Sequence, residues 1–168
     1  MIKNSHRLGF TLIEVLVVMV IIGILIRAAS VSLSGVSDKA YVESEASYIY
    51  KLLKSMPEEA ILAKKEIGLG ISNNSLDFLE YNEKTSQWEP YKGATGKSNY
   101  KLDESVKAEL EIEGNNVSSG NSGKPAMVFY SSGESTPFTL RIMSKDDATI
   151  GFTIRTDKSD EIIFEEKK

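Results

Sequence analysis

Two hydrophobic patterns follow one another in the N-terminal part of the chain. Residues 10–26 read FTLIEVLVVMVIIGILI, seventeen positions of which only Glu14 is charged. A leader, residues 1–9, precedes them and carries the basic residues Lys3 and Arg7. A helix needs roughly 17–25 apolar residues to span a bilayer, so this run is just long enough, and small and apolar residues up to position 33 extend it. The pattern predicts a transmembrane helix over residues 10–33.

The next segment is amphipathic. Apolar side chains recur at spacings of three and four residues, which is the periodicity of a helix; they are Val36, Ala40, Ala46, Ile49, Leu52, Leu53 and Met56. Charged residues fill the opposite face: Asp38, Lys39, Glu43, Glu45, Lys51 and Lys54. The spacing predicts an amphipathic helix over residues 34–66, with one face packed on a globular head.

Pro57 is expected to interrupt this helix. Proline lacks a backbone N–H and its ring clashes with the preceding turn. The sequence Ser55-Met56-Pro57-Glu58 also fits a capping box, S-x-x-E, which marks the start of helices. We therefore expect the helix to kink or restart near Pro57, with a second helical piece from Glu59 to Glu66 that Gly68 closes.

Beyond residue 67 the hydrophobic period falls to two, which is typical of strands. The expected strands are Ile67–Ser72, Leu76–Tyr81, Val106–Glu113, Met127–Ser131, Phe138–Met143, Ile150–Thr156 and Glu161–Glu165. Hairpin turns are expected at Ser72–Ser75 and Lys145–Ala148, and a mobile loop at the glycine-rich segment Gly114–Gly123. The fold class is α+β, a long N-terminal α-helix packed on a C-terminal antiparallel β-sheet domain, residues 67–168.

The composition of the chain excludes most kinds of catalytic site. The chain has no cysteine, and its single histidine, His6, lies in the leader. If the leader is cleaved, Ser-His-Asp triads, Cys-His dyads and histidine-bound zinc are all excluded. Cleavage would also change the net charge from −4 to −6, which argues against a nucleic-acid partner. We expect no enzyme activity, no metal and no cofactor.

One segment is similar to the end of a phosphate-binding loop. Gly93-Ala94-Thr95-Gly96-Lys97-Ser98 lacks the first glycine of that motif, because Tyr91 stands at its position. The motif also needs a preceding apolar strand, and Trp88–Tyr91 does not have the pattern of one. A surface turn is the better interpretation.

The start of the chain, Gly9-Phe10-Thr11-Leu12-Ile13-Glu14, resembles the class III signal sequence of type IV pilins and type II secretion pseudopilins. The resemblance implies cleavage after Gly9 by a prepilin peptidase, N-methylation of Phe10, and pairing of Glu14 with a neighbouring subunit's N-terminus. It also implies a pilin-like fold. An ordinary signal peptide cleaved near Ala28 is disfavoured by the acid in its apolar core, and a plain membrane anchor does not account for the motif.

A second resemblance lies in the C-terminal half. Phe129–Leu140 reads FYSSGESTPFTL and resembles the segment F-x-P-S-G-E-x-T-P-F-x-L of type II secretion protein H, the H-type minor pseudopilin. Residues 59–62 and 66–69, with Trp88, also resemble that family. Ser131 replaces the usual proline, and Pro57 is a further departure. From the residues alone, Phe129–Leu140 is a strand, a Ser-Gly-Glu turn and a second strand, a hairpin that closes the β domain.

This second resemblance implies a structural subunit at or near the tip of a pseudopilus that drives export of folded proteins across the outer membrane. The implied partners are other pseudopilins, major and minor, bound through the N-terminal helix, the prepilin peptidase and the inner-membrane secretion platform. The expected topology is a single pass through the inner membrane, with the N-terminus in the cytoplasm and the head in the periplasm. A minor pilin of a type IV pilus or DNA-uptake system is the alternative function; a membrane-anchored hydrolase lacks the residues for catalysis.

Overall fold

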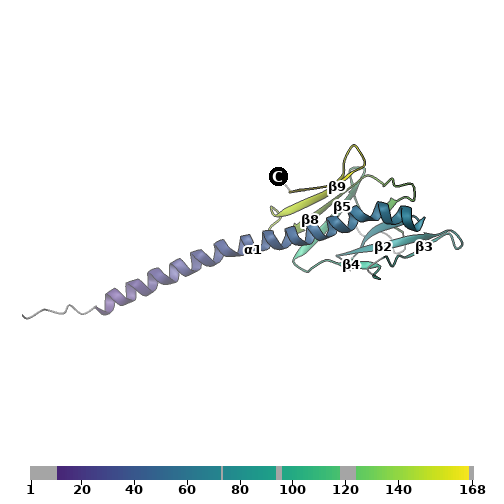
Figure 1. Cartoon of the computed structure of the whole chain (residues 1–168). Helices are drawn as coiled ribbons and strands as arrows, with labels where there is room; N and C mark the ends of the chain where they lie inside the picture. The colour runs from purple at the N-terminus through teal and green to yellow at the C-terminus, as the bar shows by residue number, and fades with distance from the viewer. Residues whose placement is uncertain (1–10, 73, 94–95, 118–123, 167–168) are drawn as a thin grey trace, which may run out of the picture. The chain divides into compact units, whose positions relative to one another are not determined.

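The computed structural model describes the backbone of residues 11–72, 74–93, 96–117 and 124–166, and their side chains except for those of residues 27–37. The chain divides into two compact units, residues 1–37 and 38–168. One α-helix, α1 (Leu12–Ala63), begins in the first unit and continues into the second (Figure 1).

The helix passes through Pro57 without ending. It finishes at Ala63, where Lys64 adopts a positive φ of 53°. The predicted restart is therefore wrong, and so is the predicted closure by Gly68; the kink near Pro57 stays a prediction. Ser55 does not cap a helix, because its hydroxyl donates to the carbonyl of Leu52.

Tertiary packing explains why the helix survives this proline. A proline inside a helix costs about 3 kcal/mol. Leu53 and Met56 before Pro57 and Ala60 after it are all buried in the core. A helix that stopped at residue 56 would leave Ala60 without this packing, so burial on both sides of the proline outweighs its local cost.

The head contains two antiparallel sheets. The first sheet consists of β1 (Ile67–Ser72), β2 (Ser75–Asn82), β3 (Gln87–Pro90), β4 (Asn99–Lys101) and β7 (Met127–Phe129), in the order β3-β2-β1-β7 with β4 also paired to β2. The second sheet consists of β5 (Val106–Ile112), β6 (Asn115–Val117), β8 (Phe138–Ser144), β9 (Gly151–Thr156) and β10 (Ile162–Glu166), in the order β10-β9-β8-β5-β6.

All the predicted strands occur, with ends within two residues of the predicted ones. Three further strands, β3, β4 and β6, were not predicted; they have only three or four residues each. Trp88 lies in β3, so the segment before the glycine-rich turn is a strand after all. The loop predicted at Gly114–Gly123 is wrong for Asn115–Val117, which pair with β5; residues 118–123 lie outside the described part.

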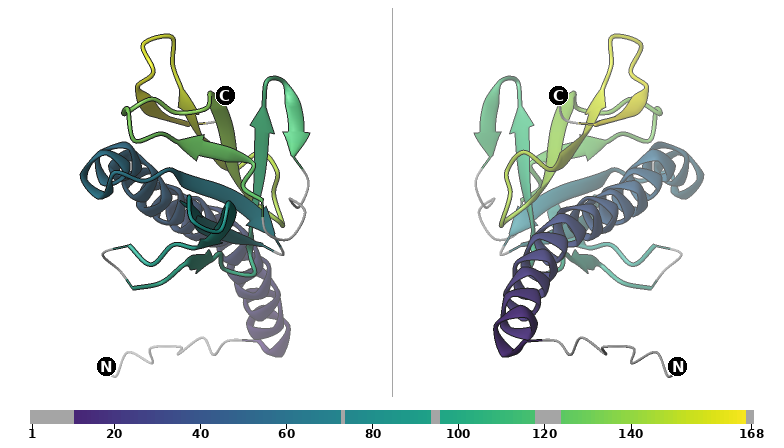
Figure 2. Two further views of the ribbon diagram at one scale, coloured as in Figure 1. Left: turned by 90° about the vertical axis from the view of Figure 1, so that its right-hand side faces the viewer. Right: turned by 90° about the vertical axis from the view of Figure 1, so that its left-hand side faces the viewer.

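The second half of α1 packs into the head through one stripe of side chains. Its members are buried and follow one another at alternating spacings of four and three residues: Val42, Ala46, Ile49, Leu53, Met56 and Ala60. Figure 1 shows β2, β3 and β4 on one side of this half of the helix and β5, β8 and β9 on the other. In Figure 2 the β9–β10 hairpin and the first sheet's outer strands likewise lie on opposite sides of it. The predicted face was correct for Ala46, Ile49, Leu53 and Met56, but Ala40 is exposed.

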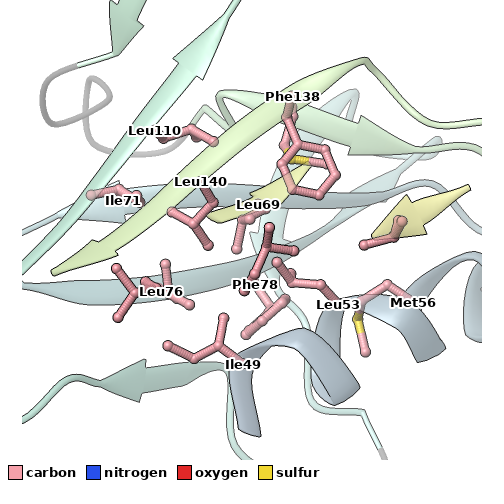
Figure 3. Packing of buried hydrophobic residues seen from close by; sticks show 14 of the residues in the cluster. Ile49, Leu53, Met56, Leu69, Ile71, Leu76, Phe78, Leu110, Phe138 and Leu140 are labelled. Atoms are coloured by element: carbon pink, nitrogen blue, oxygen red, sulfur yellow. The ribbon is translucent and has the colours of Figure 1, made fainter. Parts of the chain in front are cut away.

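The core is shared by the helix and both sheets. Figure 3 shows Ile49, Leu53 and Met56 of α1 pointing toward side chains of both sheets. The first sheet contributes Leu69, Ile71, Leu76 and Phe78, and the second contributes Leu110, Phe138 and Leu140. This helix-on-sheet arrangement confirms the predicted α+β fold class.

Candidate assembly site

The N-terminal unit begins with a capped helix. Thr11 lies directly before α1, and the backbone N–H of Glu14 donates to its hydroxyl at 3.3 Å and to its carbonyl at 3.1 Å. Thr11 and Glu14 therefore have the T-x-x-E spacing of a capping box. A carboxylate in the first turn also interacts favourably with the positive end of the helix dipole. The role of Thr11 was not predicted from the sequence, although the T-x-x-E spacing indicates it.

Exposed apolar side chains surround Glu14 in this unit. Every large apolar residue from Leu12 to Ile26 is exposed, from 45% at Ile22 to 85% at Leu12. Surfaces of this kind mark contacts with lipid or with other protein chains. Gly9 and Phe10, the predicted cleavage and methylation residues, lie outside the described residues.

The transmembrane helix predicted over residues 10–33 is not confirmed. No helix in the described part of the chain contains a stretch long and apolar enough to cross a membrane.

In the head, the segment Phe129–Leu140 forms the predicted hairpin. The N–H of Tyr130 donates to the carbonyl of Glu134, and the N–H of Gly133 donates to the carbonyl of Tyr130, both at 2.9 Å. Phe129 forms a bridge with Ser135. Gly133 has a φ of 95°, a region that favours glycine.

This hairpin connects the two sheets. Val128 of β7, in the first sheet, donates its N–H to the hydroxyl of Thr136 at 3.2 Å, and β8 of the second sheet starts two residues later at Phe138. The turn also lies against α1, since a Cβ on Gly133 would be 3.1 Å from Cδ1 of Ile61. The motif therefore has a structural role, which agrees with its interpretation from the residues.

Two tyrosines, one directly after β3 and one in β4, contact carboxylates of α1. The Tyr91 hydroxyl donates to Glu59, and the Tyr100 hydroxyl donates to Glu45. Partial burial, followed by these hydrogen bonds, raises the pKa of both phenols well above their ordinary value. The two carboxylates are fourteen residues apart, so they lie on the same flank of the helix.

These tyrosines predict how stability depends on pH. Both pKa values are higher in the folded state than the ordinary 10.0, so the fold favours the protonated phenol. Their contribution is then complete below about pH 10 and is lost as the pH rises above it. We expect the urea unfolding midpoint of the full chain in detergent micelles to be flat between about pH 7 and 9 and to fall by about pH 11. The double variant Tyr91→Phe/Tyr100→Phe should show a clearly shallower fall; an unchanged slope would contradict the assignment.

The described residues offer little chemistry beyond these contacts. They include no group of three or more His, Cys, Asp or Glu side chains placed to hold a metal ion. Asp147 uses its carboxylate within its own turn, where it accepts hydrogen bonds from the N–H and hydroxyl of Thr149. These hydrogen bonds lower its pKa.

Two stretches of the chain match known protein families. Residues 4–26 match the prokaryotic N-terminal methylation motif. Together with the helix and the antiparallel head, this defines the class as a pilin-like subunit. Residues 45–159 match the family of type II transport protein GspH. The chain belongs to this family, that of the H-type pseudopilins of type II secretion.

Named relatives and solved structures agree with this assignment. The chain is 33% identical over 147 residues to type II secretion system protein H of Pseudomonas aeruginosa, covering 82% of this chain and 83% of that protein. The protein of the same name from Aeromonas hydrophila is 24% identical over 170 residues, with 95% and 92% covered. The crystal structure of the minor pseudopilin EpsH of Vibrio cholerae superimposes with a TM-score of 0.67 at 22% identity, covering 77% of this chain and 96% of that one. This last similarity shows the shared fold.

Proposed function

We propose that this protein is a minor pseudopilin that assembles, at or near the tip, into the periplasmic pseudopilus of a type II secretion system and thereby supports export of folded proteins across the outer membrane. The observation that carries the proposal is the combination of the two family matches, which together cover residues 4–26 and 45–159. The role is structural and not enzymatic, and no cofactor or metal takes part in it.

The first step in this function is N-terminal processing. A prepilin peptidase cleaves between Gly9 and Phe10, and the new amine of Phe10 is methylated. The match of residues 4–26 to the methylation motif supports this step. Before assembly, the N-terminal helix anchors the subunit in the inner membrane with a single pass, and the head lies in the periplasm. The secretion platform in that membrane is a further partner, and the subunit leaves the membrane when it joins the pseudopilus.

Assembly then follows from the chemistry of the N-terminal unit. The apolar side chains between Leu12 and Ile26 become covered by the helices of other pseudopilins, and Glu14 meets the methylated amine of a neighbour. An isolated carboxylate in hydrocarbon is costly, whereas a paired one recovers part of that cost. The exposed positions of these side chains and the carboxylate in the first turn support this arrangement.

Mass analysis of the mature N-terminus tests this proposal. The full chain purified from cells that contain the secretion system should start at Phe10 and carry one additional methyl group. A Gly9→Leu variant should retain all of residues 1–9, because a bulky residue does not fit a cleavage site selected for glycine. A mature protein that starts elsewhere, for example near Ala28, would contradict the proposed processing and the assembly that depends on it.

A further inference from the structure

One flank of α1 within the head has an aromatic groove beside it. The helix side of the groove consists of Tyr41, Glu45 and Tyr48, and the other side is β4 with the turn that follows it, residues 100–104. We call these residues the tyrosine groove. Tyr48 and Tyr100 also line a pocket of about 220 Å³, whose other main walls are Leu52, Met56, Phe78 and Tyr91.

The aromatic side chains of the groove are accessible. Tyr41 and Tyr48 are 44% and 48% exposed, and their seven-residue spacing places them on one face of the helix. The ring of Tyr48 lies 5.0 Å from that of Tyr100, with the planes tilted by 32°. Tyrosine is enriched at protein interfaces because it provides contact area at a low entropic cost.

Polar contacts order this surface before any partner binds. The hydroxyl of Tyr100 interacts with Glu45, and that of Tyr41 interacts with Asp103. Asp103 is itself fixed, since it accepts the N–H of Ser105 at 2.8 Å and its hydroxyl at 2.7 Å. Rigid contact groups lose little entropy on association, which favours binding.

The other flank of the same helix is already covered. There the Lys39 ammonium lies 2.5 Å from the Glu166 carboxylate of β10, and the ring of Tyr50 lies 5.5 Å from that of Phe164. The C-terminal strand therefore covers one flank of α1 within the head. The flank that carries Tyr41 and Tyr48 has no equivalent strand over it in the described part of the chain, and β4 is an edge strand with three residues.

The charges around the groove limit which partner it accepts. Its rim carries three acidic residues, Glu45, Asp103 and Glu104, and one basic residue, Lys101. Lys145 also approaches, since its ammonium donates to the backbone carbonyl of Glu104 at 2.6 Å. The pocket contains one acid, Glu59, and one base, Lys97, so its formal charges balance. Its other walls are mainly apolar. The complementary surface has an apolar side chain for the pocket and a basic one for the acidic rim.

We propose that the tyrosine groove is the docking surface for the head of a neighbouring pseudopilin, which inserts an apolar side chain between Tyr48 and Phe78 and places a basic side chain against Glu104. This inference rests on the proposed function, since it requires assembly. The helix supports the choice of partner, since one side of the groove lies on α1, the element along which subunits pack in the proposed function.

Photo-crosslinking in cells that contain the secretion system tests the groove. The photoreactive amino acid p-benzoylphenylalanine, which resembles tyrosine in shape, replaces Tyr48 in the full chain. Two further positions serve as controls. Val18 reports assembly through the N-terminal helix, and Lys158, exposed in the hairpin between β9 and β10, reports random contact. The covalent products are identified from the masses of their crosslinked peptides.

We expect Tyr48 to crosslink to another pseudopilin, at about threefold or more the yield found at Lys158. Glu104→Lys should lower that yield by about threefold or more, because it places like charges together. The matched variant Glu113→Lys, also an exposed acid in a turn, should leave it unchanged.

Two results would overturn this inference. One is a Tyr48 yield no higher than that at Lys158, and the other is a main product with a secreted cargo protein; in both cases normal crosslinking at Val18 leaves the proposed function standing. Loss of pseudopilin products at Val18 as well would instead remove the proposed function itself.

Discussion

Replacing Glu14 with glutamine is expected to reduce incorporation of the subunit into the pseudopilus at least tenfold, with a corresponding loss of secretion. The change keeps the size and shape of the side chain and removes only its charge. In our proposal that charge faces the methylated amine of a neighbour within packed helices. Removing one partner of a buried ion pair costs about 3–5 kcal/mol, and about 1.4 kcal/mol already corresponds to a tenfold change in an equilibrium constant.

The measurement compares sheared pseudopili from wild-type and variant cells by quantitative immunoblotting, with total protein as the reference. Glu43→Gln is the matched control, because Glu43 is an exposed carboxylate on the same helix within the head. Thr11→Ala is the second control, since it removes the cap that the N–H of Glu14 binds and keeps the carboxylate. Normal incorporation of the Glu14→Gln subunit would contradict the pairing; an equal loss with Thr11→Ala would indicate helix capping as the cause.

The fold was predictable wherever a hydrophobic period runs over several residues. The strand β1 was predicted at its true ends, because Ile67, Leu69 and Ile71 alternate with two glycines and turn residues follow them. The strand β4, Asn99–Lys101, carries no such signal. It is a strand because β2 provides its hydrogen-bonding partners, a contact between residues more than twenty positions apart. At Pro57 the error was the opposite one. A restart was predicted because proline disfavours a helix interior, but the packing of Met56 and Ala60 outweighs this local cost.

Glu14 and the tyrosine groove also differ in how far they could be predicted from the sequence. Glu14 was found from sequence because its signal is local, one carboxylate in an apolar run. The tyrosine groove was not found. Tyr48 and Tyr100 are fifty-two residues apart, and neither departs from the ordinary pattern of its own segment. Only the approach of β4 to α1 brings their rings together. Sites assembled by long-range contacts leave no pattern in a single sequence.

Replacing Gly68 with alanine is expected to destabilise the head by about 2–3 kcal/mol, the upper part of the range for overpacking a core. Gly68 is buried in β1, and a Cβ there would overlap the ring of Pro125, at 2.5 Å from its Cγ, and would lie 3.0 Å from Cζ3 of Trp88. The proline ring is rigid and its segment leads directly into β7, which pairs with β1. Relief would therefore require the two strands to move apart, at the cost of core contacts on both sides.

Gly70 in the same strand provides the control that separates steric overlap from strand propensity. The nearest heavy atoms to a Cβ at Gly70 are the backbone oxygens of Asp77 and Lys124, at 3.9 and 4.0 Å, which is ordinary contact. Gly70→Ala should change stability by less than about 1 kcal/mol, because it also reduces the entropy of the unfolded chain. In thermal unfolding of the full chain in detergent micelles, Gly68→Ala should lower the midpoint by about 5–12 °C, and Gly70→Ala should leave it nearly unchanged. Equal effects at the two positions would show that loss of glycine in β1, and not the contact with Pro125, decides the stability of this sheet.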